Sequence, residues 1–224
     1  MNPTSKLNYK TPCIAALLGL VTFLVSAPAQ AASVSIGYNK GSGAGNGNIP
    51  GLKLTMSAVL DPEQLEWELT SFTWLTSTGS SAVATGRNAL YIFDASVFTS
   101  PGGMTTDNIT SATAGFIAQS DSYTAGSYVF SSAVILKGDK TYYFLNSTAL
   151  GAGGTSNYGF TTSSIAGMER WSGNGSTKTW NSSASSGAPN FAATFIPVPV
   201  PEPATVTALL GLVGIALFLF KRRR

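Results

Sequence analysis

Four carboxylates stand close together in the sequence and are the first candidates for chemistry. Glu66 and Glu68 are two residues apart in a run of aromatic and apolar residues. If this run is a β-strand, their side chains point to the same side, about 6–7 Å apart, close to the spacing of paired carboxylates in glycoside hydrolases. Asp61 and Glu63 offer the oxygens that Ca²⁺ prefers. Neighbouring acids on one strand are nevertheless typical of a solvated surface, and we favour that interpretation.

Two residue types that carry much of enzyme chemistry are absent or nearly so. The chain has no His and one Cys, Cys13. Without imidazole, Ser-His-Asp and Cys-His catalysis in their usual forms and zinc sites that need His are excluded. Asp94, Asp107, Asp121 and Asp139 are scattered beside expected turns, and turn chemistry accounts for them. We therefore expect no catalytic residue, no metal site and no cofactor, with calcium between loops left open.

Two tryptophans are candidates for contact with a sugar. Trp171 and Trp180 flank the polar stretch Ser172–Thr179. Most aromatic side chains in such a chain pack in the core. A tryptophan beside a polar stretch is instead expected to be partly exposed, and its ring face could stack on a sugar ring. The pair is therefore a candidate carbohydrate contact, as an alternative to core packing.

The N-terminal end has the three parts of a secretory signal peptide. Met1–Lys10 is polar with two lysines, Cys13–Ala27 is mostly apolar, and Ala29-Gln30-Ala31 supplies small residues for cleavage. The apolar stretch is about 15 residues long, which is short for a membrane span. We predict that residues 1–31 are a cleaved signal peptide and that the mature, exported chain begins at Ala32. The mature chain then has no cysteine and no disulfide.

The C-terminal end combines a proline-rich stretch, an apolar stretch and a basic cluster. Prolines alternate along Pro197–Pro203, which favours extended backbone. Ala204–Phe220 follows without a charged residue, and its length allows about 25 Å of helix, enough for a short membrane span. Four cations prefer the cytoplasmic side of a membrane, and they close the chain: Lys221, Arg222, Arg223 and Arg224. We predict a single transmembrane helix with a cytoplasmic C-terminus and the body outside.

This order of features resembles the PEP-CTERM protein-sorting signal. The residues that match its usual start are Val200, Pro201, Glu202, Pro203, Ala204 and Thr205. The resemblance implies that Pro201, Glu202 and Pro203 are a recognition motif for an exosortase, a membrane transpeptidase-like enzyme that processes such proteins near this motif. It also implies a bacterium that makes exopolysaccharide, and a body that ends at the cell surface or in the matrix. The alternative is an ordinary tail anchor on a proline-rich stalk.

Between the two ends the sequence is typical of an all-β domain. Aromatic and β-branched runs alternate with stretches rich in Gly, Ser, Asn and Thr. No stretch has a sustained helical period. We expect strands at Ser33–Tyr38, Leu52–Leu60, Leu65–Thr76, Ala89–Ala95, Ala114–Gln119, Ser127–Leu136, Thr141–Asn146, Tyr158–Thr162, Glu169–Trp171, Thr177–Trp180 and Asn190–Ile196. They predict an antiparallel β-sandwich of jelly-roll type.

Three local patterns make sharper predictions. Along Leu65–Leu75 the polar side of the strand turns apolar at Phe72, which predicts a β-bulge or a passage into full burial. Ala89–Phe93 is continuously apolar and predicts a central strand. Lys137–Lys140 lies between two β runs and predicts a hairpin turn, with its glycine at the position of positive φ.

Two segments of the body, Ala89–Ala95 and Leu136–Leu145, resemble the β-sandwich bodies that often precede such sorting signals, the choice-of-anchor type domains. The chain thus divides into a signal peptide (1–31), a β-sandwich domain (32–196) and a sorting signal (197–224). Between residues 32 and 201 there are 7 basic and 9 acidic residues, so no basic surface indicates a nucleic-acid partner.

Together these features predict an exported, non-enzymatic protein. It would first be a single-pass protein of the envelope membrane and later lie at the cell surface or in the extracellular matrix, with a structural or adhesive role. The expected partners are an exosortase, the membrane and exopolysaccharide. Two alternatives stay open: a carbohydrate-binding module retained in the exopolysaccharide, and a glycoside-active enzyme that uses the acidic residues.

Overall fold

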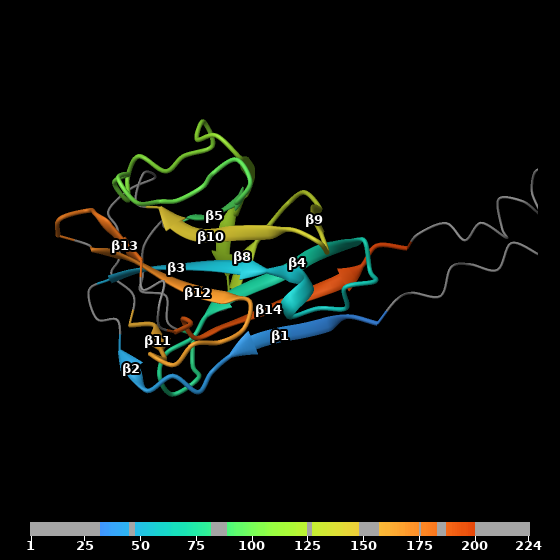
Figure 1. Cartoon of the computed structure of the whole chain (residues 1–224), viewed down its shortest axis with the longest axis horizontal. Helices are drawn as coiled ribbons and strands as arrows, with labels where there is room; N and C mark the ends of the chain where they lie inside the picture. The colour runs from blue at the N-terminus through green and yellow to red at the C-terminus, as the bar shows by residue number, and fades with distance from the viewer. Residues whose placement is uncertain are drawn as a thin grey trace, which may run out of the picture. The chain divides into compact units, whose positions relative to one another are not determined.

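The computed structural model describes seven stretches of the chain: residues 32–44, 48–81, 89–124, 127–147, 157–174, 176–182 and 187–199. The predicted signal peptide and the predicted transmembrane helix lie outside them. Within these stretches no helix is long and apolar enough to cross a membrane. The structure is built from strands that pair antiparallel (Figure 1).

The first large sheet has β4 at its centre. Its order is β1-β14-β4-β8-β7, and β9 pairs with the first half of β4. The strands are β1 (Val34–Tyr38), β4 (Glu66–Trp74), β7 (Ser122–Thr124), β8 (Ser127–Val129), β9 (Val134–Lys137) and β14 (Phe191–Pro197). Because Val34 pairs with Phe195, the body's first strand begins beside the end of its last strand.

The second large sheet has the order β13-β12-β3-β10-β5-β6. Its strands are β3 (Asn48–Thr55), β5 (Ala89–Asp94), β6 (Phe116–Gln119), β10 (Thr141–Ser147), β12 (Met168–Asn174) and β13 (Trp180–Ser182). A short 3₁₀ turn, η1 (Met56–Ala58), follows β3, and a small third sheet joins β2 (Gly43–Ala44) to β11 (Gly159–Phe160).

The main core lies between the two large sheets. Phe72 of β4 stacks on Phe144 of β10 with ring centroids 5.2 Å apart, and on Phe191 of β14 at 5.7 Å. All three rings are fully buried. Burial of an aromatic side chain of this size contributes roughly 1.5–3 kcal/mol. The contact between Phe72 and Phe144 crosses from one sheet to the other, and both rings belong to one core cluster, so the two sheets pack face to face.

A second apolar cluster covers the other face of the second sheet. Tyr91, Phe93 and Tyr143 alternate with the residues of the main core, and Phe98 and Ile109 pack on them from the segment between β5 and β6. This segment lies above β5 and β10 in Figure 1. The second sheet is therefore buried on both faces, which explains the unbroken apolar run of β5. The prediction that this run is a central strand is confirmed, since β5 lies between β10 and β6.

A buried polar bridge joins the two sheets. Asn146 of β10 accepts a hydrogen bond from Trp74 Nε1 at 2.8 Å and donates from Nδ2 to the Tyr128 hydroxyl at 2.6 Å. Asn146 and Tyr128 are each 1% exposed and Trp74 is fully buried. Burial raises the pKa of Tyr128 far above its ordinary value, so its hydroxyl stays protonated.

Most of the strands predicted from the sequence overlap strands of the structure. The all-β, antiparallel architecture is confirmed, and the specific jelly-roll order stays a prediction. The bulge is confirmed, because the register of β14 against β4 shifts between Thr194 and Phe195, skipping Thr70. This shift returns Phe72 and Trp74 to the core. The expected strand Ser127–Leu136 is instead two strands, β8 and β9.

The hairpin predicted at Lys137–Lys140 was wrong. The strands on either side belong to different sheets, since β9 pairs with β4 and β10 pairs with β3 and β5. The turn therefore crosses from one sheet to the other. Gly138 is not among the residues with positive φ. A glycine is needed there because a Cβ would overlap the main-chain carbonyl oxygen of Gln64.

Candidate functional site

The described part of the chain ends at Pro199, two residues after β14. β14 pairs with β4 as far as Pro197, opposite Trp67. One residue further, the Val198 N–H donates a hydrogen bond to the Glu66 carbonyl oxygen at 3.0 Å. Val198 is half-buried and Pro199 is exposed. Val198 is thus the last residue of the described chain that the sheet holds by a main-chain hydrogen bond.

A side chain from a distant loop holds the same residue a second time. Gln64 Nε2 donates to the carbonyl oxygens of Glu66 and Val198, both at 2.9 Å. Only the nitrogen of the amide can donate to two carbonyl oxygens, so the acceptors fix the orientation of the side chain. We call the hydrogen bonds of Gln64 Nε2 and of the Val198 N–H the Gln64 clasp. Both main-chain polar groups of Val198 are occupied by it.

The loop that carries Gln64 is itself tightly placed. The Gly138 N–H donates to the Leu65 carbonyl oxygen at 2.8 Å, and Gly138 approaches the Gln64 main chain too closely for any Cβ. The turn between the two sheets therefore supports the loop from one side. On its other side Leu65 is 63% exposed.

The four carboxylates do not converge. Glu66 and Glu68 lie half-buried on β4, away from the core side taken by Trp67 and Leu69, and Glu66 is paired in register with Lys137 of β9. Asp61 accepts a hydrogen bond from the Glu63 N–H at 2.9 Å within an exposed turn. Within the described residues no group of three or more His, Cys, Asp or Glu could hold a metal ion.

Two of the other acids that the structure describes, Asp94 and Asp107, hold turns and loops in place. Asp94 accepts bonds from the Ser96 N–H and hydroxyl at 2.7 and 2.6 Å. Asp107 accepts from Lys178 Nζ and from the Thr105 hydroxyl, both at 2.6 Å. These two hydrogen bonds, that of Lys178 foremost, lower the pKa of Asp107 to about 2. This lysine–aspartate pair links the segment between β5 and β6 to the turn before β13.

The predicted exposure of the two tryptophans was wrong. Trp171 is 6% and Trp180 5% exposed, and both belong to the second apolar cluster. The polar stretch between them is mostly the turn joining β12 to β13, and the pairing of Gly173 with Trp180 directs the indoles onto the sheet. Both side chains crowd Gly51, where a Cβ would meet Trp180 Cζ3 at 2.9 Å and Trp171 Cβ at 3.0 Å. Buried between strands, they offer no open ring face to a sugar.

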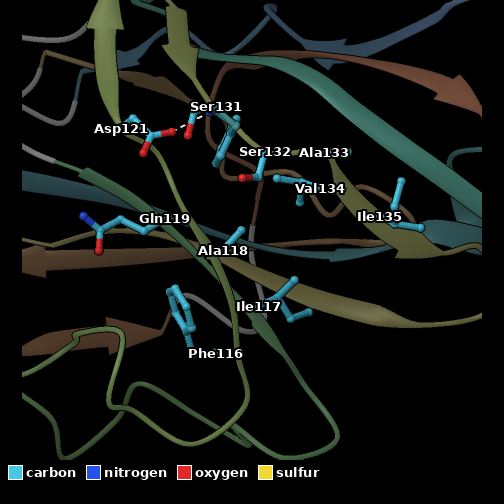
Figure 2. Close-up of a pocket in the computed structure, with 11 residues that line it drawn as sticks. Phe116, Ile117, Ala118, Gln119, Asp121, Ser131, Ser132, Ala133, Val134 and Ile135 are labelled. Carbon is cyan, nitrogen blue, oxygen red and sulfur yellow. Dashed lines mark hydrogen bonds between the residues drawn. The ribbon is translucent and has the colours of Figure 1, made fainter.

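A groove that the sequence did not predict lies at the open side of the sandwich, between β6 and the segment leading into β9 (Figure 2). Its volume is about 570 Å³. Apolar side chains come from Ile117, Phe130 and Val134, and polar ones from Gln119, Asp121 and Ser131. Figure 2 shows Asp121 and Ser131 at one end and Phe116 at the other. The lining side chains are individually ordinary, so no motif announced the groove.

The lining of the groove combines apolar side chains with polar ones and one carboxylate, that of Asp121. Asp121 Oδ2 accepts a hydrogen bond from the Ser131 N–H at 2.5 Å. That hydrogen bond lowers the pKa of Asp121, so the carboxylate stays charged at neutral pH. The residues that line the groove include no Lys or Arg. The groove therefore offers hydrogen-bond acceptors and apolar surface but no partner for an anion.

The residues predicted to form the sorting signal lie outside the described stretches. They are Pro201, Glu202 and Pro203 of the motif and the basic residues Lys221–Arg224. Evidence on them comes from comparison with known proteins. Residues 199–224 match the family model described as the PEP-CTERM protein-sorting motif. No curated protein and no solved structure matches the chain. The match begins at the residue that follows the Gln64 clasp. The chain therefore carries a PEP-CTERM sorting motif, which begins directly after Val198, the last residue of the described chain that the sheet holds by a main-chain hydrogen bond.

Proposed function

We propose that this is an exported, non-enzymatic protein whose β body is delivered to the cell surface or extracellular matrix, where its role is structural or adhesive. The observation that carries the proposal is the sorting motif at residues 199–224. Such a motif indicates export to the envelope and processing by an exosortase. A structural role is also in keeping with the acids that the structure describes, which are exposed, half-buried on strands, hydrogen-bonded in turns or paired with a lysine, without a cluster of three or more that could hold a metal ion.

The physical chemistry of the termini supports the same route. A cleaved signal peptide, residues 1–31, would bring the body across the membrane. The uncharged stretch Ala204–Phe220 would then pause in the bilayer, because apolar burial stabilises it by roughly 25 cal/mol per Å². The basic residues Lys221–Arg224 would stay on the cytoplasmic side. This arrangement would keep the Pro-Glu-Pro stretch on the outer side, where alternate prolines favour an extended backbone.

The experiment compares wild type with Pro201→Ala/Glu202→Ala/Pro203→Ala in the native host. We expect wild type to lose its last 20 or so residues and the variant to stay full length in the membrane fraction. Thr162→Ala/Ser163→Ala/Ser164→Ala is the control, since it makes three alanine changes at exposed residues of a loop that does not carry Gln64. It should be processed like wild type. Equal retention of the intact C-terminus in wild type and triple variant would reduce the segment to a plain anchor.

A second candidate function is binding of exopolysaccharide, and the groove is the observation that favours it. Phe130 offers an aromatic ring, and Gln119, Asp121 and Ser131 offer groups that exchange hydrogen bonds with sugar hydroxyls. The test is co-sedimentation of the protein with exopolysaccharide purified from the host. Phe130→Ala and Asp121→Asn should both weaken the binding, and Asp61→Asn, in an exposed turn elsewhere, should not. Unchanged binding in the two groove variants would remove the groove from consideration.

A further inference from the structure

The sorting motif follows the folded body with almost no spacer. Val198 is fixed to the sheet, and Pro201 comes three residues later. Three extended residues span at most about 10 Å. Enzymes that bind a peptide in extended form commonly hold several consecutive residues through their main-chain N–H and C=O groups. An enzyme acting at Pro201–Pro203 therefore competes with the body for the residues that precede the motif.

The Gln64 clasp decides the outcome of this competition. The Val198 N–H is bonded to the Glu66 carbonyl oxygen, and the Val198 carbonyl oxygen is bonded to Gln64 Nε2. Neither group is available to another protein while the clasp is closed. Opening needs no unfolding of the core, because Val198 lies beyond the last strand pair, Pro197 with Trp67. Chain ends of this kind open locally at a fraction of the global free energy of unfolding.

We infer that Gln64 is a positioning residue for processing of the sorting motif: the closed clasp withholds Val198 from the processing enzyme, and its opening sets how fast the motif is used. The inference rests on the proposed function, because it presupposes that the motif is processed. It goes further in naming a residue, 134 positions from Val198 in sequence, that regulates the step.

The test is a pulse–chase measurement of processing of the full-length chain in the native host. Gln64→Glu is close in shape but directs a carboxylate oxygen at two carbonyl oxygens, so the clasp opens. Gln64→Ala removes the donor. Loss of one or two hydrogen bonds of ordinary strength shifts an opening equilibrium about three- to tenfold. We expect processing to speed up by that factor in both variants. Gln119→Glu makes the same change on β6 of the other sheet and should leave the rate unchanged.

A second variant distinguishes an effect on the accessibility of the motif from an effect on the stability of the body. Six Gly/Ser residues inserted between Val198 and Pro199 free the motif from the clasp, so processing should speed up and Gln64→Glu should add nothing. If Gln64→Glu accelerates both chains equally, a general weakening of the body is responsible and the inference is overturned. An unchanged or slower rate in Gln64→Glu of the original chain overturns it as well. The proposed function fails separately, when wild type and the Pro201–Pro203 triple variant remain equally unprocessed.

Discussion

Replacement of Asn146 by leucine should destabilise the body through the partners that it leaves behind. Asn146 links the two sheets by accepting from Trp74 Nε1 and donating to the Tyr128 hydroxyl. Leucine has a similar volume and cannot take part in either bond. The Trp74 Nε1–H and the Tyr128 hydroxyl then lose their hydrogen-bond partner. Both lie in the core, since Trp74 is fully buried and Tyr128 is 1% exposed.

The magnitude follows from the number of groups left unpaired. A buried polar group without a partner costs about 1–3 kcal/mol, so two such groups cost about 2–6 kcal/mol. The Trp74 indole also interacts with the Tyr128 hydroxyl, so the two groups can partly satisfy one another in the variant. We therefore expect a loss of about 2–4 kcal/mol, a large part of the 5–15 kcal/mol that stabilises an ordinary domain.

Urea unfolding of residues 32–199, produced without the flanking segments, measures this loss as a shift of the midpoint at constant slope. Asn181→Leu, at an exposed asparagine of β13, is the matched control and should stay within about 0.5 kcal/mol of wild type. Tyr128→Phe should be destabilising in wild type, where it leaves the Asn146 amide without its acceptor. In the Asn146→Leu background it should be neutral or stabilising, because it removes an unpaired hydroxyl. A loss below 1 kcal/mol for Asn146→Leu, or strict additivity of the two changes, would refute the reasoning.

Three further outcomes follow from the described contacts. Gly138→Ala should destabilise the body by about 1–3 kcal/mol in the same urea assay, because its Cβ would overlap the Gln64 carbonyl oxygen; wild-type stability would contradict the close approach. The pKa of Asp107 is lowered to about 2 by Lys178 and Thr105, so its contribution to stability is complete above pH about 4 and is lost as the pH falls toward 2. Asp107→Asn should accordingly lose less stability than wild type between pH 5 and pH 2, and parallel pH profiles would argue against the ion pair. Finally, dithiothreitol should not change the unfolding midpoint of residues 32–199, because this stretch has no cysteine.

Elements whose cause is local were predictable from the sequence. The change in β4 could be inferred because a strand whose polar face turns apolar either contains an extra residue or passes into full burial, and the structure has the extra residue at Thr70. β5 was recognised as central because a run buried on both faces has no polar alternation. The sorting motif was recognisable for a similar reason, since its proline stretch, apolar stretch and basic end are contiguous in sequence.

Features that depend on distant partners were not predictable. The turn around Gly138 resembles a hairpin in sequence, and only the pairing of its flanking strands with different sheets shows that it is not one. Trp171 and Trp180 were expected to be exposed because they flank a polar stretch. They are buried because the segment between β5 and β6 covers them and the small Gly51 leaves room for their side chains. Gln64 has no local feature that marks it, because its acceptor at Val198 is 134 residues away.

The mass of the intact mature protein, recovered from the native host, tests the central claim most directly. The account predicts a chain that begins at Ala32 and has lost the residues beyond the Pro-Glu-Pro stretch, so that both targeting ends are missing and the β body remains. A measured mass that includes Ala204–Arg224, in protein recovered from the cell surface or the matrix, would contradict sorting through the C-terminal motif.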